Sequence, residues 1–133
     1  MSVNLIDSST IRVVQNSNNI SLASNANEYS TTETVIGTWI DGKSLYRKVY
    51  SITSPSSTNA NYADLSSLNI ETTVHLYGYY KKNTGTFGIP FYDSDSNYSV
   101  IFINNSNQLR GRFGNSSEIT DAKVVIEYTK TTD

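Results

Sequence analysis

The strand-forming character of the chain is clearest in Thr34-Val-Ile-Gly-Thr-Trp-Ile-Asp-Gly-Lys-Ser-Leu-Tyr-Arg-Lys-Val-Tyr-Ser-Ile52. Two runs of β-branched and aromatic residues, which pack well on a pleated sheet, flank Asp41 and Gly42. Asp-Gly tolerates the positive φ angles of a type I′ turn, and the twist of that turn matches the strands it joins. This stretch therefore predicts a β-hairpin with its turn at Asp41 and Gly42.

Further strands are predicted after the hairpin. Apolar and aromatic runs separated by polar turns indicate strands at residues 73–81, 86–92, 98–104, 109–113 and 122–129. Pro90 lacks an N–H group and demotes its run to an edge or bulged strand. Residues 54–68 have the composition of a loop, with room for one helical turn near residues 62–68. About seven strands without a long helix predict an all-β fold, an antiparallel, jelly-roll-like β-sandwich.

The predicted strand at residues 73–81 carries large side chains on both faces. Alternation places Val74, Leu76 and Tyr80 on one face and His75, Tyr77 and Tyr79 on the other. An antiparallel sheet with one wet face shows a clearer alternation of apolar and polar residues. We therefore expect the second face to be covered by another sheet or by another copy of the chain.

The composition limits the domain count and the classes of partner. The 133 residues suit one domain, with residues 31–133 as the sandwich and residues 1–30 as a lead-in, either edge strands or the end of a stalk. The formal net charge of −2 gives no cationic field for nucleic acid or anionic membranes. There is no cysteine, no apolar run that could insert into a membrane, and no secretion signal at the first residues, so we expect a soluble protein.

Two segments of the sequence resemble a known family. Val35-Ile-Gly-Thr-Trp-Ile-Asp-Gly-Lys-Ser-Leu-Tyr-Arg-Lys-Val-Tyr50 and Ile126-Glu-Tyr-Thr-Lys-Thr-Thr-Asp133 are similar to parts of the C-terminal domains of bacteriophage and prophage tail fibre or minor structural proteins. In that family a GTWIDGKPLYRK hairpin lies near the start of the domain and an EYTKTTD strand ends it. Ser44 stands here in place of the proline. The two segments bracket residues 33–133 and leave the middle uncovered.

The resemblance implies a trimeric receptor-binding or fibre-tip domain with no chemistry of its own. Such a domain is made in the cytoplasm of a bacterial host and is carried on the tail of a virion or phage-like particle. Its partners would be two further copies of itself, the rest of the tail fibre and a bacterial cell surface. The alternatives are a purely structural trimeric tail or baseplate module, a polysaccharide depolymerase, and a toxin or lectin of non-phage origin.

Tyrosines beside acidic and arginine side chains are the best candidates for a ligand site. Aromatic rings stack on the apolar faces of sugars, and polar groups bind sugar hydroxyls, so a cell-surface polysaccharide is the expected ligand. The candidate residues are Tyr79, Tyr80, Tyr92, Asp93, Asp95, Tyr98, Arg110 and Arg112. Arg110 and Arg112 share one strand face and could hold a phosphate or carboxylate. The alternative for each residue is packing within the sheet or at a subunit interface.

The hairpin residues Trp39, Asp41, Gly42 and Arg47 are predicted to be structural. We expect Trp39, together with Ile36, Leu45 and Val49, to anchor the core or the seam of a trimer. Asp41, Gly42 and Arg47 are expected to serve the turn and the interface.

The sequence offers little for catalysis or metal binding. It has one histidine and none of the common nucleophile or phosphate-binding motifs. His75 is expected to be packed or hydrogen-bonded, with a metal ion or anion on a trimer axis as the alternative. Asp93, Asp95 and Asn97 match the first ligand positions of a calcium loop, but the later positions do not match, so an ordinary polar turn is expected. We predict no enzyme, no cofactor and no metal site.

Overall fold

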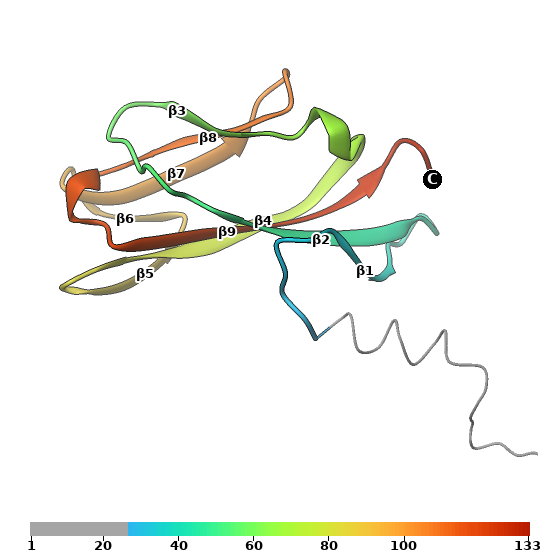
Figure 1. Ribbon diagram of the computed structural model, residues 1–133, viewed down its shortest axis with the longest axis horizontal. Coiled ribbons are helices and arrows are strands. Elements are labelled where there is room, and N and C mark those ends of the chain that lie inside the picture. The colour runs from blue at the N-terminus through green and yellow to red at the C-terminus, as the bar shows by residue number, and fades with distance from the viewer. Residues whose placement is uncertain (1–26) are drawn as a thin grey trace, which may run out of the picture.

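Two antiparallel β-sheets face each other in the computed structural model, which describes residues 27–133 (Figure 1). Sheet A has the order β1-β2-β9-β4-β5, with β1 at Thr34–Thr38, β2 at Ser44–Ser51, β9 at Asp121–Lys130, β4 at Ile70–Lys82 and β5 at Gly85–Ile89. Sheet B has the order β3-β8-β7-β6, with β3 at Ala60–Asp64, β8 at Gln108–Phe113, β7 at Asn97–Ile103 and β6 at Phe91–Ser94. The predicted antiparallel β-sandwich is confirmed. Most of the predicted lead-in, residues 1–26, lies outside the described residues.

The predicted hairpin is confirmed as β1 and β2. Gly42 has a φ angle of +90°, in the left-handed region that glycine adopts without steric penalty. The Asp41 carboxylate accepts a hydrogen bond from the N–H of Lys43 at 3.0 Å. The N–H of Gly42 donates to the carbonyl of Trp39 at 2.9 Å, so Ile40 and Asp41 are the central residues of the turn. Asp41 lacks the positive φ angle that a type I′ turn requires, so the predicted turn type is wrong although the hairpin itself is confirmed.

The prediction of about seven strands is too low, since the described chain forms nine. Residues 60–64, predicted as part of a loop, form β3 and pair with β8. The polar composition hides this strand, because only Tyr62 and Ala63 pack against the core. The helical turn predicted nearby is a short 3-10 helix, η1, at Ser66–Leu68. Neither η1 nor η2 (Ser116–Glu118), the helices of the described chain, is long enough to traverse a bilayer.

Pro90 divides the predicted strand at residues 86–92 between the two sheets. β5 ends at Ile89 on the edge of sheet A, and β6 begins at Phe91 on the edge of sheet B. The Ile89–Pro90 peptide bond is cis. Because proline has no N–H group to give to a neighbouring strand, it is tolerated at sheet edges. The prediction of an edge strand is confirmed, although the predicted single strand is divided into two edge strands, β5 and β6.

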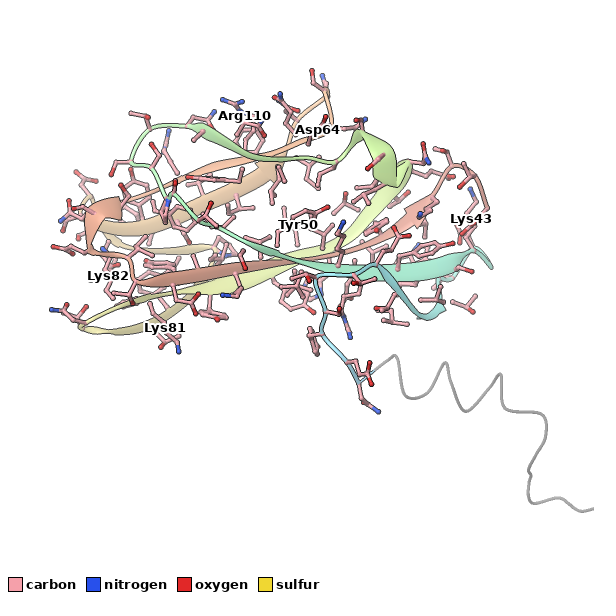
Figure 2. All side chains as sticks on the ribbon, in the orientation of Figure 1. Lys43, Tyr50, Asp64, Lys81, Lys82 and Arg110 are labelled. Carbon is pink, nitrogen blue, oxygen red and sulfur yellow. The ribbon has the colours of Figure 1, made fainter. Side chains whose placement is uncertain are left out.

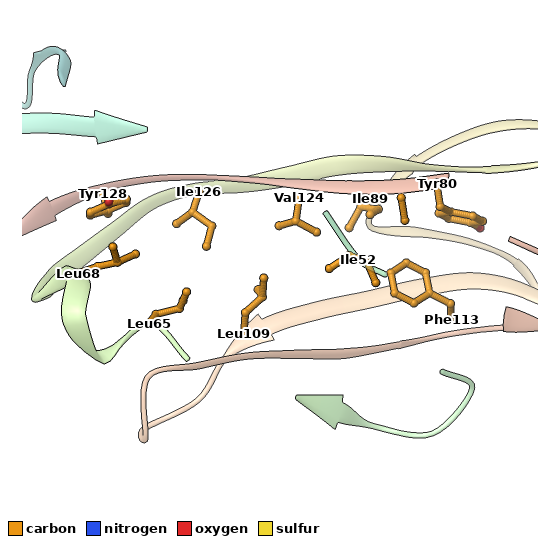
Figure 3. Packing of buried hydrophobic residues seen from close by; sticks show 11 residues of the cluster. Ile52, Leu65, Leu68, Tyr80, Ile89, Leu109, Phe113, Val124, Ile126 and Tyr128 are labelled. Carbon is orange, nitrogen blue, oxygen red and sulfur yellow. The ribbon is translucent and has the colours of Figure 1, made fainter. Parts of the chain in front are cut away.

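The hydrophobic core lies between the sheets (Figure 3). The large hydrophobic residues of β9 and β8 that are fully buried are Val124, Ile126, Tyr128, Leu109 and Phe113. Tyr80 of β4 stacks on Phe87 of β5 with 5.2 Å between ring centroids, and it meets Phe113 of sheet B edge-on at 5.7 Å. Buried aromatic pairs of this kind add stability beyond the burial of area. These rings therefore join the two sheets at one end of the sandwich.

The two faces of β4 have different surroundings. Leu76 and Tyr80 point into the core, whereas His75, Tyr77 and Tyr79 pair with outward residues of β9. Sheet B covers only the first of these faces. Residues 29–31 lie against part of the second, where the carbonyl of Ser30 accepts a hydrogen bond from the N–H of Val49 at 2.9 Å. The face that another copy of the chain could cover is therefore the outer face of sheet A. That another copy covers it stays a prediction.

The close pairing of β4 with β9 requires a glycine at position 78. A Cβ atom there would collide with the backbone carbonyl of Lys123, which no change of rotamer relieves. We expect Gly78→Ala to lower the free energy of unfolding by roughly 2 kcal/mol or more. Gly88→Ala is the matched control, because a Cβ at Gly88 meets no atom within 4 Å. Urea unfolding followed by circular dichroism measures both, and equal stability of the two variants would contradict this pairing.

Candidate ligand-binding face

The outer face of sheet B, here called the sheet B face, carries a row of aromatic, apolar and basic side chains. Alternation along β7 turns Tyr98, Val100 and Phe102 outward, while Ile101 and Ile103 pack against the core. The strand register sets their neighbours, since Tyr98 lies opposite Tyr92 of β6, Val100 opposite Arg112 of β8, and Phe102 opposite Arg110. In Figure 2 Arg110 points away from the core. Directly opposed Cβ atoms are about 5 Å apart, so these residues form one continuous surface.

An open cavity of about 530 Å³ lies on the sheet B face. Its lining residues are Ser57, Thr58, Asn59, Phe91, Tyr92, Asp95, Tyr98, Val100 and Arg112. Tyr92 is 69% exposed and Val100 is 41% exposed, so a ligand can reach both side chains. A volume of this size lies within the range of small-molecule pockets.

The aromatic groups of the cavity are held by specific contacts. The hydroxyl of Tyr92 donates to Asp95 Oδ1 at 3.1 Å. This hydrogen bond to a carboxylate raises the pKa of Tyr92 above its ordinary value. The ring of Tyr98 packs on Gly114, where a Cβ atom would lie 2.7 Å from a ring carbon. The guanidinium of Arg112 lies 6.0 Å from the centroid of the same ring, at the outer limit of a cation–π contact.

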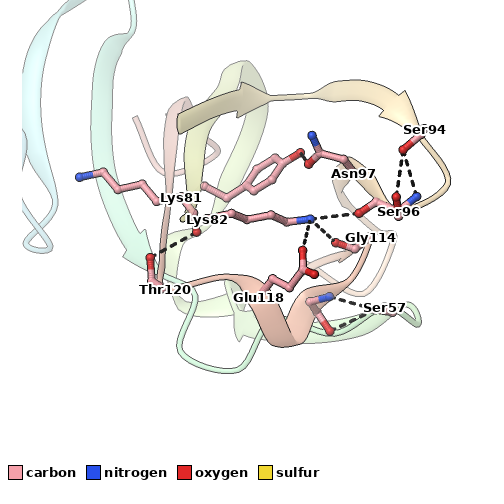
Figure 4. A network of polar contacts seen from close by, with 11 residues as sticks. Ser57, Lys81, Lys82, Ser94, Ser96, Asn97, Gly114, Glu118 and Thr120 are labelled. Atoms are coloured by element: carbon pink, nitrogen blue, oxygen red, sulfur yellow. Dashed lines mark hydrogen bonds and ion pairs between the residues drawn. The ribbon is translucent and has the colours of Figure 1, made fainter. Parts of the chain in front are cut away.

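Lys82 holds the turns at this end of sheet B (Figure 4). Its side chain is 3% exposed, and its ammonium group donates to the carbonyls of Ser96 and Gly114, each at 3.0 Å. It also forms an ion pair with Glu118 at 3.5 Å. A buried charge needs such partners, because transfer from water is otherwise very costly. Ser96 lies in the β6–β7 turn and Gly114 follows β8, so one cation fixes two turns beside the cavity.

The cavity is suited to a ligand with both hydroxyl groups and apolar ring faces. Tyr92 and Tyr98 offer aromatic surface, and Ser57, Thr58 and Asn59 offer neutral hydrogen-bonding groups. Asp95 and Arg112 add one group of each charge. In the part of the chain that the structure describes, no three His, Asp or Glu side chains gather as a metal site.

The structure brings together part of the predicted ligand site. Of the eight candidates, Tyr92, Asp95, Tyr98 and Arg112 line the cavity. Arg110 lies on the same face of β8, and its guanidinium donates to Gln108 Oε1 at 3.3 Å. Asp93 is exposed on β6 and does not line the cavity.

Two of the predicted residues lie elsewhere, and the prediction for Tyr80 is wrong. Tyr80 is fully buried in the core, where its hydroxyl donates to Asn97 Oδ1 at 2.9 Å, so no ligand can reach it. Tyr79 lies on the outer face of sheet A, and its hydroxyl donates to Asp121 at 2.7 Å. The sequence prediction placed Tyr79 and Tyr80 in one site, but adjacent residues of a strand point to opposite faces of the sheet.

Several lining residues were not identified from the sequence. Alternation from Tyr98 could have indicated Val100, since both occupy outward positions of one strand. The local sequence did not indicate the loop residues Ser57, Thr58 and Asn59, because their position depends on a contact with a residue far away in the sequence. The N–H of Phe113 donates to the carbonyl of Ser56 at 2.7 Å, which brings this loop to the end of sheet B.

Trp39 does not have the predicted place in the core. It is half-buried next to the turn and lies outside the core cluster, to which β2 contributes Tyr46 and Tyr50. The expectation of a core anchor is therefore wrong, because Trp39 begins the turn after β1 and lies on neither strand. A place for Trp39 in a trimer seam stays a prediction.

Arg47 is the centre of a polar cluster on the outer face of sheet A. Its Nε donates to Glu127 at 2.9 Å, and its guanidinium lies 4.0 Å from the ring centroid of Tyr29. Glu127 also accepts a hydrogen bond from Tyr77 at 2.8 Å. Burial, together with hydrogen bonds to Tyr29 and Glu127, raises the pKa of Tyr77 well above its ordinary value. Arg47 therefore ties the hairpin to β9 and to the segment before β1.

The two segments that carry the family resemblance lie side by side as β2 and β9. Tyr46 lies opposite Tyr128, with 5.8 Å between their stacked rings, and the hydroxyl of Tyr46 donates to Asp133 at 2.7 Å. Tyr128 and Lys130 both bind Glu33. The hairpin and the last strand therefore form one unit, although about eighty positions separate them in the sequence.

The remaining candidates are placed as follows. The imidazole of His75 is 61% exposed and packs on the Tyr77 ring at 4.2 Å, with Nδ1 3.9 Å from Glu127. A metal ion or anion on a trimer axis at His75 stays a prediction. Asp93, Asp95 and Asn97 belong to the end of β6, the β6–β7 turn and the start of β7, as expected for a polar turn.

The fold and this face define the chain only as an antiparallel β-sandwich with an exposed aromatic and basic surface. No family model, no curated protein and no solved structure matches it.

Replacing Lys82 tests the support of the cavity. Lys82→Met keeps most of the volume but leaves the carbonyls of Ser96 and Gly114 without their donor, which we expect to cost roughly 2–3 kcal/mol. Lys81→Met is the matched control, because Lys81 is an exposed neighbour on the same strand. Thermal unfolding by calorimetry measures both variants. A Lys82→Met protein as stable as Lys81→Met would contradict the role assigned to Lys82.

Proposed function

We propose that the chain is a tail-fibre tip domain of a bacteriophage or phage-like particle that binds a polysaccharide of the bacterial surface without catalysis. The observation that carries this proposal is the cavity on the sheet B face, with Tyr92, Tyr98 and Arg112 in its lining. The resemblance of β2 and β9 to tail-fibre domains supports the viral setting.

The sheet B face suits a sugar chain because it is open along the strands. Beyond the cavity, the outward row of β7 continues from Val100 to Phe102, which is 37% exposed. An extended polymer can therefore lie across β6, β7 and β8, with ring faces on the aromatic side chains and hydroxyls on the polar ones. Strand positions hold these side chains at fixed spacings, which favours a repeating ligand.

Self-association is assigned to the outer face of sheet A. A groove of about 500 Å³ on this face is lined by Tyr29, Ser30, Thr31, Val49, Tyr77, Gly78, Tyr79, Lys123 and Val125. Two ion pairs, Arg47 with Glu127 at 2.9 Å and Lys123 with Asp121 at 2.6 Å, neutralise charges on the same face. A face whose charges are already paired can be buried against a second copy at a smaller desolvation cost. Residues 27–33 also enter the domain on this side, where a fibre would approach (Figure 1).

Trimerisation compensates for the openness of the ligand cavity. An exposed site buries little of its ligand, so each copy binds weakly. Three linked copies convert later binding events into intramolecular ones and raise the total affinity without new contacts. A non-catalytic adhesin therefore needs no deep pocket.

Binding to cell-wall polysaccharides tests the ligand site. We expect the wild-type protein to bind at least one polysaccharide from a panel purified from the surfaces of different bacteria, and Tyr92→Ala to reduce that binding by about tenfold. Ile40→Ala is the control, because Ile40 is also exposed but lies at the hairpin turn. Loss of binding in both variants would contradict the assigned face. Failure of the wild-type protein on every polysaccharide would favour the purely structural module.

Light scattering tests the assembly. We expect the mass of a trimer for the wild-type protein and of a monomer for Tyr79→Lys, because the new ammonium group would add a positive charge to the interface, where Asp121 is already paired with Lys123. Tyr92→Lys, a tyrosine of the opposite outer face, should keep the trimer. A monomeric wild-type protein would overturn the proposed assembly.

A further inference from the structure

We infer that the polysaccharide recognised by the sheet B face is acidic, and that Arg112, with Arg110 beside it, binds its phosphate or carboxylate groups. This inference rests on the proposed function and specifies its ligand. It starts from the ion pairing of the basic side chains.

Most basic side chains of the described chain already have an acidic partner. Lys43, Arg47, Lys82, Lys123 and Lys130 each lie within 4.0 Å of a carboxylate. Lys48, Lys81, Arg110 and Arg112 form no such pair, and of these four only Arg110 and Arg112 lie in sheet B. The positive charge on the sheet B face is therefore available to a ligand.

The two arginines are also arranged to act together. They occupy alternate positions of β8 and point to the same face, about 7 Å apart along the strand. Each lies opposite an exposed apolar residue of β7, Phe102 for Arg110 and Val100 for Arg112. The guanidinium groups thus lie beside apolar surface, where an ionic hydrogen bond is stronger than in open water. A planar guanidinium matches phosphate and carboxylate oxygens in a bidentate geometry.

The carboxylate in the cavity lining is not paired with Arg112. Asp95 Oδ1 accepts the hydroxyl of Tyr92, and no ion pair joins Asp95 to Arg112. The cavity therefore has two chemically different ends. Asp95 and the neutral groups of residues 57–59 suit sugar hydroxyls, while Arg112 suits the anionic substituent.

The test compares each bound polysaccharide before and after its charge is removed. The wild-type protein is titrated with the purified wall polysaccharides in native form, after removal of phosphate with hydrofluoric acid, and after reduction of their carboxyl groups. We expect binding only to acidic polymers, loss of at least about tenfold in affinity on one of the two treatments, and weaker binding as salt is raised. The treatment that abolishes binding identifies the anion as phosphate or carboxylate.

Variants complete the test. We expect Arg112→Gln to reduce binding of the native polymer by about tenfold, and Arg112→Lys to restore part of it because charge returns without the bidentate geometry. Lys81→Gln removes an equal charge from the other sheet and should change nothing. Binding that survives both treatments and Arg112→Gln would overturn this inference while leaving the proposed function in place. Absence of binding to any native polymer would overturn both.

Discussion

The whole sandwich depends on the burial of β9 on both of its faces. Val124, Ile126 and Tyr128 are fully buried toward sheet B, and on the other face Val125 and Thr129 are buried as well. A strand enclosed in this way can be central only if both neighbours pair with it over most of its length, and β2 and β4 do so. The pairing of the chain end with the hairpin and with β4 therefore fixes the positions of all the other strands in sheet A.

A charged residue occurs within this enclosed strand because the neighbouring strands compensate for its burial. Glu127 points to the outer face between two strands, where its carboxylate is mostly enclosed. Arg47 and Tyr77, from the neighbouring strands on either side, supply the donors that an enclosed carboxylate requires. Breaking such a cluster by removing one partner is costly, so the cluster sets the register of three strands at once. Arg47, which the sequence assigned to an interface, therefore has a structural role within the subunit, where it helps to set the strand register.

The sequence alone predicted the parts of this fold that have local signals. The Asp41-Gly42 turn and the strands rich in apolar residues needed no long-range information. β3 was missed because its polar residues resemble a loop, and only its pairing with β8 makes it a strand. Likewise Tyr79 and Tyr80 are adjacent in sequence but lie on opposite faces of one sheet. The candidate ligand residues are therefore divided among the outer face of sheet A, the core and the sheet B face. Residues 57–59 reach the cavity through long-range contacts, among them Phe113 N–H to Ser56 and Ser116 N–H to Ser57, that no local pattern could indicate.

The proposed ligand site has a property that follows from strand geometry. On β7 the outward residues Tyr98, Val100 and Phe102 belong to the site, and the inward residues Ile101 and Ile103 belong to the core. The same division holds on β8, where Arg110 and Arg112 alternate with Leu109 and Phe113. Because the two sets of side chains do not share space, the chemistry of the face can change while the core stays the same. A change of ligand at this face therefore does not require a change of fold, which is an advantage under the proposed function.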